Sequence, residues 1–195
     1  EAEGPETGTQ SSGGWPGDAD LENAIPALNA GDTNDASFIE FDFVPIANSI
    51  SFDFLFASEE YGTFQCGFTD AFAFLLTDLT TGVTTNLALV PGTTDVVSVF
   101  TVRDNAYNAS CASVNPGYFD SFYGTGGQPL VNDPIDFRGY TRSMTAFSNV
   151  TPNNNYRIKL VIADDGDTLF NAAVFLGAGS FDLGGDLGDD VTISA

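Results

Sequence analysis

The sequence predicts an all-β protein, an antiparallel β-sandwich with long loops and little helix. Apolar residues alternate with polar ones in several short segments, as where Ile39, Phe41 and Phe43 enclose Glu40 and Asp42. This period of two is typical of strands that bury one face. Gly, Pro, Asn and Asp separate the segments, and a content of 20 Asp and 14 Asn favours turns over helices. Many short strands at regular spacing are typical of a sandwich.

The expected elements follow in chain order. Residues 1–17 are rich in Gly, Ser, Thr, Pro and acid and are expected to form a flexible lead-in. Residues 20–25 can form one helical turn, capped by Asp18 or Asp20 and ended by Pro26. Strands are expected at 38–43, 50–56, 72–76, 86–90, 96–102, 156–162 and 172–175. Residues 182–195 are expected to be a Gly/Asp-rich linker in which 191–193 can form an edge strand, so residues 18–181 form one domain.

Residues 103–142, called the excursion below, break this rhythm. A connection of that length inside a compact domain is usually functional or disordered. Its aromatic residues favour an ordered path over the sheet, either as a recognition surface or as cover for an exposed sheet face. A metal held by Asp104 and Asp136 could fix the excursion or offer an open coordination position to a ligand. The expected ligand-binding residues are Asp104, Asn105, Tyr107, Asp136 and Arg138.

The net charge of −22, from 27 acidic and 5 basic residues, restricts the possible partners. Nucleic acids and anionic membrane surfaces bind basic surfaces, so both are excluded. No apolar run approaches the ~20 residues of a membrane helix, so membrane insertion is not expected. A hydrophobic fraction of 43% supports a folded core, and bound Ca²⁺ would offset the repulsion among the acids. The alternative is a halophilic or merely soluble acidic surface.

Two acidic clusters at strand ends are the candidates for a Ca²⁺ site. Calcium takes six to eight oxygen ligands and tolerates irregular geometry. The second cluster lacks the spacing of an EF-hand, so a site must be assembled from separate loops. The alternative is that these acids only form turns and accept hydrogen bonds at strand ends. The expected metal ligands are Glu59, Glu60, Asp70, Asp164, Asp165, Asp167 and Asn171.

An enzymatic role is not expected. The chain has no His, which excludes the usual zinc sites and His-based triads. Glu59 and Glu60 are the obvious carboxylate pair for glycoside hydrolysis, but adjacent residues on a strand point to opposite faces. Cys66 and Cys111 both lie in polar, loop-like sequence, so a disulfide formed in an oxidising compartment is expected in preference to a metal pair.

Several motifs in series resemble the bacterial extracellular choice-of-anchor L domain. They lie at residues 18–21, 34–45, 56–61, 86–93, 158–167 and 173–181. The resemblance implies a secreted or surface-anchored β-sandwich, found alone or inside large adhesins. Similar modules in calcium-dependent bacterial adhesins bind peptides, with a calcium ion that helps to hold the free carboxylate of a target protein's C-terminus. By this resemblance, Glu59, Glu60, Asp70, Asp164 and Asp167 belong to the metal or its scaffold.

We therefore expect an extracellular or cell-surface module for calcium-dependent adhesion, as in a biofilm. Its partner would be a peptide or protein terminus, or a glycan, on another cell or surface. The alternative is a self-assembling, calcium-stabilised fibre or matrix subunit. Family members usually have strands upstream of residues 18–21, whereas about 17 residues precede them here, so the domain is expected to be shortened, cut or completed by another chain. A sheet that lacks an edge partner is a template for a strand from another chain.

Overall fold

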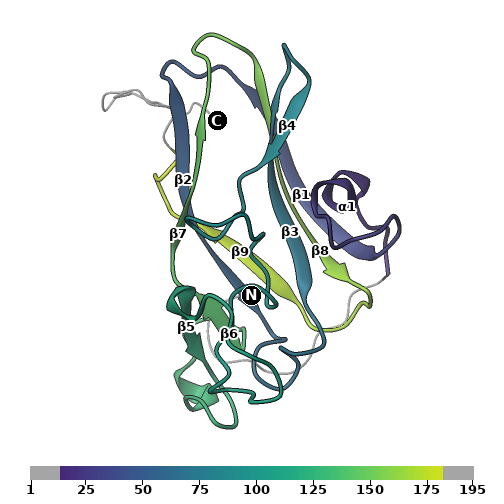
Figure 1. The fold of residues 1–195 in the computed structure, drawn as a ribbon, viewed down its shortest axis with the longest axis vertical. Coiled ribbons are helices and arrows are strands. Elements are labelled where there is room, and N and C mark those ends of the chain that lie inside the picture. The colour runs from purple at the N-terminus through teal and green to yellow at the C-terminus, as the bar shows by residue number, and fades with distance from the viewer. Residues whose placement is uncertain (1–13, 182–195) are drawn as a thin grey trace, which may run out of the picture.

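Two antiparallel sheets pack face to face in the computed structural model, which describes residues 14–181 (Figure 1). This confirms the predicted β-sandwich. The first sheet has the strand order β1-β8-β3-β4, and the second has the order β5-β6-β2-β7, with β9 also paired to β2. The strands are β1 (Thr33–Phe43), β2 (Ser49–Ser58), β3 (Asp70–Asp78), β4 (Val83–Asn86), β5 (Phe119–Phe122), β6 (Gly139–Thr141), β7 (Met144–Asn149), β8 (Tyr156–Asp165) and β9 (Ala172–Leu176). The linker and edge strand expected within 182–195, and residues 1–13 of the lead-in, lie outside the described residues.

The core between the sheets is aromatic because phenylalanines occupy the inward positions of β2 and β3. Phe54 and Phe56 of β2 are buried against Phe72 and Phe74 of β3. The ring centroids of Phe54 and Phe74 lie 4.9 Å apart, and those of Phe56 and Phe72 lie 5.1 Å apart. Aromatic pairs at such distances bury large areas and prefer edge-on or offset contacts. This packing fixes the positions of the strand ends.

The helix α1 (Ala19–Ala24) lies against the outer face of the first sheet (Figure 1). Asp18 caps it, because its Oδ1 atom accepts hydrogen bonds from the backbone N–H groups of Asp20 and Leu21, both at 3.0 Å. Leu21 is fully buried in a second apolar cluster with residues of β3 and β8. The helical turn and the cap thus lie where the sequence predicts them. Of the expected lead-in, residue 16 forms a β-bridge with Asn34 at the start of β1.

Two of the predicted strands are wrong. Only residue 86 of the predicted 86–90 strand belongs to a strand, because β4 is Val83–Asn86. The predicted strand 96–102 is a series of turns, joined to residue 89 by a single bridge at Val96. Its alternating valines, Val97 and Val99, are nevertheless fully buried. The pattern therefore predicts burial correctly, but a loop buries these side chains without a ladder of backbone hydrogen bonds.

The excursion lies at one end of the sandwich, around β5 and β6 (Figure 1). It is ordered into these two short strands and two 3₁₀ turns, Pro116–Tyr118 and Leu130–Asn132. Phe119 and Phe122 of β5 are buried in the main core. The strand β7 directly follows the excursion and was not predicted, because its alternation is weak in Met144-Thr-Ala-Phe-Ser-Asn149.

One side of the sandwich has an apolar groove between β1 and β9, with a volume of about 210 Å³. The strand β1 is the edge of its sheet, and within residues 14–181 its outer edge is paired only near its start, where residues 34–36 bond to Trp15 and Pro16. Ile39 and Phe41 on this strand are 61% and 39% exposed. The open edge therefore combines free backbone groups with apolar side chains.

Candidate functional site

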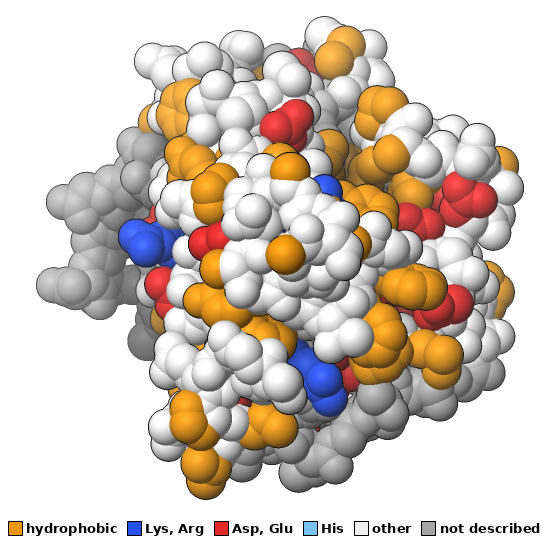
Figure 2. Space-filling view, turned by 60° about the horizontal axis from the view of Figure 1, so that its bottom comes forward, with side chains coloured by type: hydrophobic (Ala, Val, Ile, Leu, Met, Phe, Trp, Pro, Cys, Tyr) orange, Lys and Arg blue, Asp and Glu red, His pale blue; other side chains and the backbone are white. Residues whose placement is uncertain are grey.

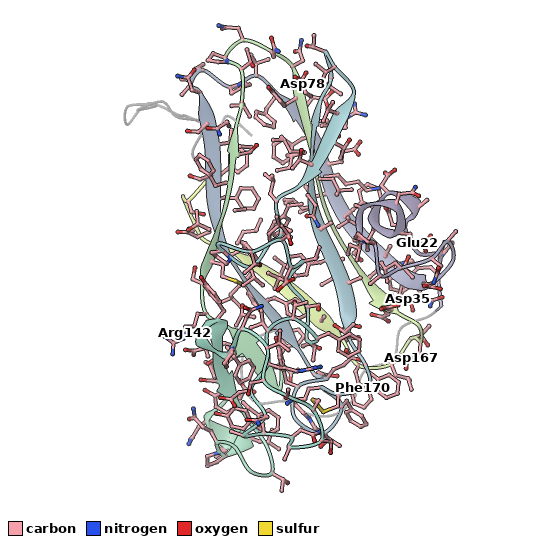
Figure 3. The ribbon with its side chains drawn as sticks, in the orientation of Figure 1. Glu22, Asp35, Asp78, Arg142, Asp167 and Phe170 are labelled. Carbon is pink, nitrogen blue, oxygen red and sulfur yellow. A yellow bond between two sulfur atoms is a disulfide. The ribbon has the colours of Figure 1, made fainter. Side chains whose placement is uncertain are left out.

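The acidic residues meet at the end of the sandwich where β2 and β8 end and β3 begins. Asp70, the first residue of β3, lies directly opposite Asp164 of β8 in the ladder. Directly opposed residues point to the same face of a sheet, and Asp70 shares its face with the core residues Phe72 and Phe74. The two carboxylates therefore close the end of the interior. Figure 3 shows Asp167 at this end and Asp78 at the opposite end.

Glu60 lies in the turn that follows β2 and is only 2% exposed. Burial raises the pKa of its carboxyl to about 8, assisted by the negative charges of Asp167, Asp164 and Asp165. Its Oε2 atom is buried and has no hydrogen-bond partner within residues 14–181. Binding of a proton or a cation to this acceptor oxygen would therefore stabilise Glu60 in its buried position.

Asp70 is also 2% exposed, and its pKa is well above the ordinary value. Burial is the main cause, followed by the charges of Glu60 and Asp164. The hydroxyl of Ser58 opposes this effect weakly by donating to Oδ2 of Asp70 at 3.4 Å. The same Oγ atom accepts a hydrogen bond of 3.0 Å from the backbone N–H of Glu60. Ser58 therefore links the two buried acids, a role that its place before the Glu pair could have suggested.

Glu59 has a different environment from Glu60, although both are buried. Its Oε2 atom accepts a hydrogen bond from the backbone N–H of Asn171 at 3.3 Å, and its own N–H donates to the carbonyl of Asn171 at 3.1 Å. These bonds join the end of β2 to the segment that enters β9. In these bonds Asn171 acts through its backbone, whereas the sequence predicted it as a side-chain ligand. The two glutamates follow β2, which ends at Ser58, so they lie at a strand end as expected, and the argument that adjacent strand residues point to opposite faces does not apply to them.

Asp165 and Asp167 lie where β8 gives way to a loop. The pKa of Asp165 is raised by burial and by the charges of Asp32 and Asp167. Asp32 contacts this loop through its backbone as well, because its carbonyl accepts from the N–H of Gly166 at 3.0 Å. Asp32 is therefore a further member of the cluster, and only the pairing of β1 with β8 reveals it. Asn34 donates to the carbonyl of Asp167 at 3.3 Å.

The loop after Asp167 is held in an unusual backbone conformation. Phe170 has a φ of 67°, which is strained for a bulky residue and occurs where surrounding contacts enforce it. Its ring packs on that of Phe64 in the turn after β2, with centroids 4.7 Å apart. Figure 3 shows Phe170 close to Asp167 of the acidic cluster. The ring contact fixes the loop against the turn that carries Glu60.

The excursion is attached to the same turn by several cross-links. Cys66 and Cys111 form a disulfide with a Cα–Cα distance of 5.5 Å. Arg103 donates from Nη1 to the carbonyl of Gln65 at 2.9 Å, and Gln65 donates from Nε2 to the carbonyl of Asp104 at 2.9 Å. These links couple the position of the excursion to that of the acidic cluster.

The predicted ligand-binding residues differ in their surroundings. Asp104 and Asn105 make local bonds, since Asp104 accepts from Ala106 at 2.9 Å and Asn105 accepts from the hydroxyl of Ser113 at 3.0 Å. Tyr107 packs on Phe119 and Phe122, so it supports the excursion from within. Asp136 and Arg138 are half-buried and lie in the segment just before β6, which begins at Gly139. Hydrophobic and acidic side chains are interspersed over this end of the molecule, where few basic groups are visible (Figure 2).

The donor chemistry of the acidic cluster suits a hard cation such as Ca²⁺. Within residues 14–181, no three acidic or sulfur side chains are arranged as a ready metal-binding group. The carboxylates instead surround a common region, in which the charge of Glu60 helps to raise the pKa of Asp70 and the charge of Asp164 helps to raise the pKa of both. Ion binding therefore requires side-chain rotation toward one point, for which the buried Oε2 atom of Glu60 provides an available oxygen.

The fold and this end of the molecule define an acidic, disulfide-bonded β-sandwich module. The chain belongs to the choice-of-anchor L domain family, and the match covers residues 1–182. It is therefore a surface-associated extracellular module. Comparison with the curated proteins and with the solved structures gave no match. Among the described residues, no helix is long and apolar enough to cross a membrane.

Proposed function

We propose that this domain is a calcium-dependent adhesion module whose acidic end binds a partner on another cell or surface. The partner is a peptide or protein terminus. The Ca²⁺ ligands are drawn from Glu60, Asp70, Asp164, Asp165 and Asp167, while Glu59 and Asn171 hold the loop that carries them. Such a role agrees with membership of a surface-associated family.

The observation that carries this proposal is the burial of Glu60 and Asp70 among other carboxylates. Every charged group that shifts the pKa of Glu60 or Asp70 is another carboxylate. Like charges in a poorly solvated site repel strongly, so the site must take up protons or a cation near neutral pH. Calcium accepts six to eight oxygens at variable angles, which suits carboxylates supplied by three separate segments.

The excursion is the proposed recognition surface because it is tied to the turn after β2. A calcium ion with an open coordination position can accept a carboxylate oxygen, and a protein C-terminus offers this group without competing side chains. The exposed side chain of Asn105 and the half-buried side chains of Asp104, Asp136 and Arg138 lie on the same excursion. Hydroxyl groups of a glycan could fill the same position and are the second ligand class to test.

The test is a binding measurement on immobilised peptides with free and amidated C-termini, with a glycan array beside them. Binding is expected in calcium, with loss in chelator and on amidation of the peptide. Asp70→Asn should abolish the calcium-dependent signal, whereas Asp78→Asn at the other end of β3 should retain it. Asp104→Ala and Asp136→Ala then test the excursion. Calcium-independent binding, or full binding by Asp70→Asn, contradicts the proposal.

We further propose binding without catalysis. Glu59 is engaged by the backbone of Asn171, while Glu60 lies among the aspartates, so the pair does not present two carboxylates to one substrate bond. Incubation with glycans and peptides in calcium should leave them intact by mass spectrometry.

The open edge of β1 favours a second candidate function, a self-assembling matrix or fibre subunit. Its free backbone groups and the apolar groove beside it are the features that accept an added strand. Sizing at increasing calcium and protein concentrations separates this role from that of a single module. Ile39→Lys should abolish such assembly, whereas Val83→Lys, on the edge strand at the other end of the same sheet, should not. A monomer at all concentrations excludes this candidate.

A further inference from the structure

A polar groove of about 550 Å³ lies on the outer face of the first sheet. α1 forms one wall with Asp20 and Asn23, and the β3–β4 hairpin forms the other with Thr84 and Asn86. Its volume is in the range of small-molecule sites. The groove is separate from the acidic cluster, because the cluster faces the interior from the end of the sandwich.

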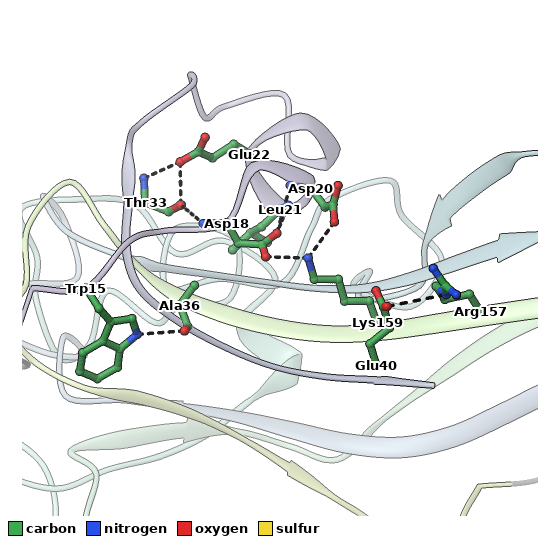
Figure 4. Close-up of polar contacts among 10 residues, drawn as sticks. All are labelled: Trp15, Asp18, Asp20, Leu21, Glu22, Thr33, Ala36, Glu40, Arg157 and Lys159. Carbon is green, nitrogen blue, oxygen red and sulfur yellow. Dashed lines mark hydrogen bonds and ion pairs between the residues drawn. The ribbon is translucent and has the colours of Figure 1, made fainter. Parts of the chain in front are cut away.

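The charges that line this groove are balanced, unlike those of the whole chain. Lys159 and Arg157, two of the five basic residues, line it together with the acids Asp20 and Glu40. Lys159 Nζ lies 2.6 Å from Asp18 and 2.7 Å from Asp20 (Figure 4). Arg157 Nε lies 3.7 Å from Glu40. Arg157 Nε also lies 2.7 Å from Asp42, so both basic groups are already paired with acids and offer no free cation to an anionic ligand.

Neutral hydrogen-bonding groups complete the lining. The hydroxyl oxygens of Thr77 and Thr84 lie 2.8 Å apart across β3 and β4. The side-chain orientation of Asn86 is fixed, because its Oδ1 atom accepts from the backbone N–H groups of Phe74 at 3.1 Å and Ala88 at 3.0 Å. Its Nδ2 atom is left without a hydrogen-bond partner among the described residues. A donor that is buried without a partner costs free energy unless an acceptor reaches it.

An aromatic ring lies beside the groove. Phe38 is on the same face of β1 as Glu40, since the two residues are two positions apart in a strand. Its ring is 59% exposed and lies 4.8 Å from Lys159 Nζ. An exposed ring beside fixed donors and acceptors offers a flat apolar surface to a ligand that is otherwise polar.

We infer that this groove binds a neutral, hydroxyl-rich ligand such as the end of a glycan chain. Sugar hydroxyls both donate and accept, so they match a lining that mixes carboxylates, cationic groups, hydroxyls and an amide. A phosphate or sulfate would meet Asp20 and Glu40, and a cation would meet Arg157 and Lys159. This second site needs no calcium, so it stands whether or not the acidic end binds the ion.

The experiment uses a panel of neutral and acidic oligosaccharides on the whole domain in chelator. Neutral oligosaccharides should bind, and acidic ones should bind at least tenfold more weakly. Thr84→Trp fills the groove and should reduce binding at least tenfold. Thr85→Trp is the matched control, because Thr85 pairs with the core residue Leu76 and faces the other side of the sheet. Both variants are checked for an unchanged melting temperature.

The outcomes separate this inference from the proposed function. Binding in chelator that Thr84→Trp removes, and that Thr85→Trp and Asp70→Asn retain, supports the groove. Absence of oligosaccharide binding in chelator overturns it, as does an equal loss in both tryptophan variants. Glycan binding that requires calcium and disappears in Asp70→Asn also overturns it and assigns the glycan to the acidic end.

Discussion

Glu60 is buried where β2 ends, although three aspartates surround it. Burial and the neighbouring negative charges make the ionised carboxylate less stable than it is in water. The pKa of Glu60 in the folded protein is therefore raised to about 8. The backbone N–H of Glu60 and the hydroxyl of Ser58 position the segment, but the Oε2 atom has no donor among the described residues. Glu60 is therefore the residue at which protonation and ion binding would compete most directly.

We predict that the metal-free protein loses stability as the pH rises from about 4.5 to 8. A glutamate in the unfolded chain loses its proton near the ordinary value of 4.5, whereas folded Glu60 retains it up to about pH 8. Between these values the folded state binds the additional proton, so the free energy of unfolding decreases as the pH rises. Asp70 acts in the same direction because its pKa is raised too. The total effect should be on the order of a few kcal/mol.

Thermal melts in chelator across this pH range measure the effect. Glu60→Gln should be more stable than the wild type at pH 8 and should show a flatter pH dependence. Glu40→Gln, a change at an exposed glutamate on β1, serves as the control and should follow the wild-type curve. Identical slopes for the wild type and Glu60→Gln would exclude Glu60 as the source.

We also predict that Lys159→Met destabilises the fold by about 2 kcal/mol, between the values typical of exposed and buried ion pairs. The Lys159 side chain is 10% exposed and joins Asp18 and Asp20 to β8, so its loss leaves the largely buried carboxylate of Asp18 without a cation. Arg157→Met is the matched control. Its side chain is 44% exposed, so solvent screens its pair with Asp42 and the loss of stability should be much smaller. Urea denaturation compares the two, and an equal loss would show that burial does not separate them.

At the scale of elements, the sequence predicted the strands that have strict alternation, including β2, β3 and β8. It failed at 96–102, where an alternating segment is buried as a loop, and at β7, where alternation is weak. The acids of the site could be placed at strand ends, because strict alternation shows where β2, β3 and β8 begin or end. Their partners could not, because the opposition of Asp70 and Asp164 depends on the register between β3 and β8. The role of Asp32 could not be predicted for a related reason, since its contact with Gly166 exists only in the folded chain.

The disulfide connects two elements of the site, the turn after β2 and the excursion. Its cysteines are separated by 45 residues, and a loop of that length corresponds to a stabilisation of up to about 4 kcal/mol from the restricted unfolded chain. We predict that the double variant Cys66→Ser and Cys111→Ser unfolds at lower urea concentration. Hydrogen exchange should accelerate first in residues 103–111. Unchanged exchange there would show that the remaining hydrogen bonds hold the excursion without the disulfide.

At the scale of the whole molecule, the net charge of −22 has two possible explanations, a generally acidic surface and a specific cation site. If the acids act only as a charged surface, any salt that screens them should stabilise the fold equally at a given ionic strength. If they form a specific site, calcium should stabilise it far beyond screening, because an ion that binds only the folded state adds about 2.7 kcal/mol at one hundred times its dissociation constant. The carboxyl groups whose pKa is raised most, those of Glu60 and Asp70, lie together at one end of the sandwich, which favours the second explanation.

We therefore predict that the melting temperature at neutral pH rises with calcium and saturates. Sodium chloride at equal ionic strength should give only a small rise. Magnesium should be less effective, because it demands near-ideal octahedral geometry and gives up water reluctantly. Asp70→Asn should lose most of the calcium effect, whereas Asp78→Asn should keep it. Equal rises in sodium chloride and calcium would identify these carboxylates as surface charge alone, and the adhesion site would then have to lie elsewhere on the domain.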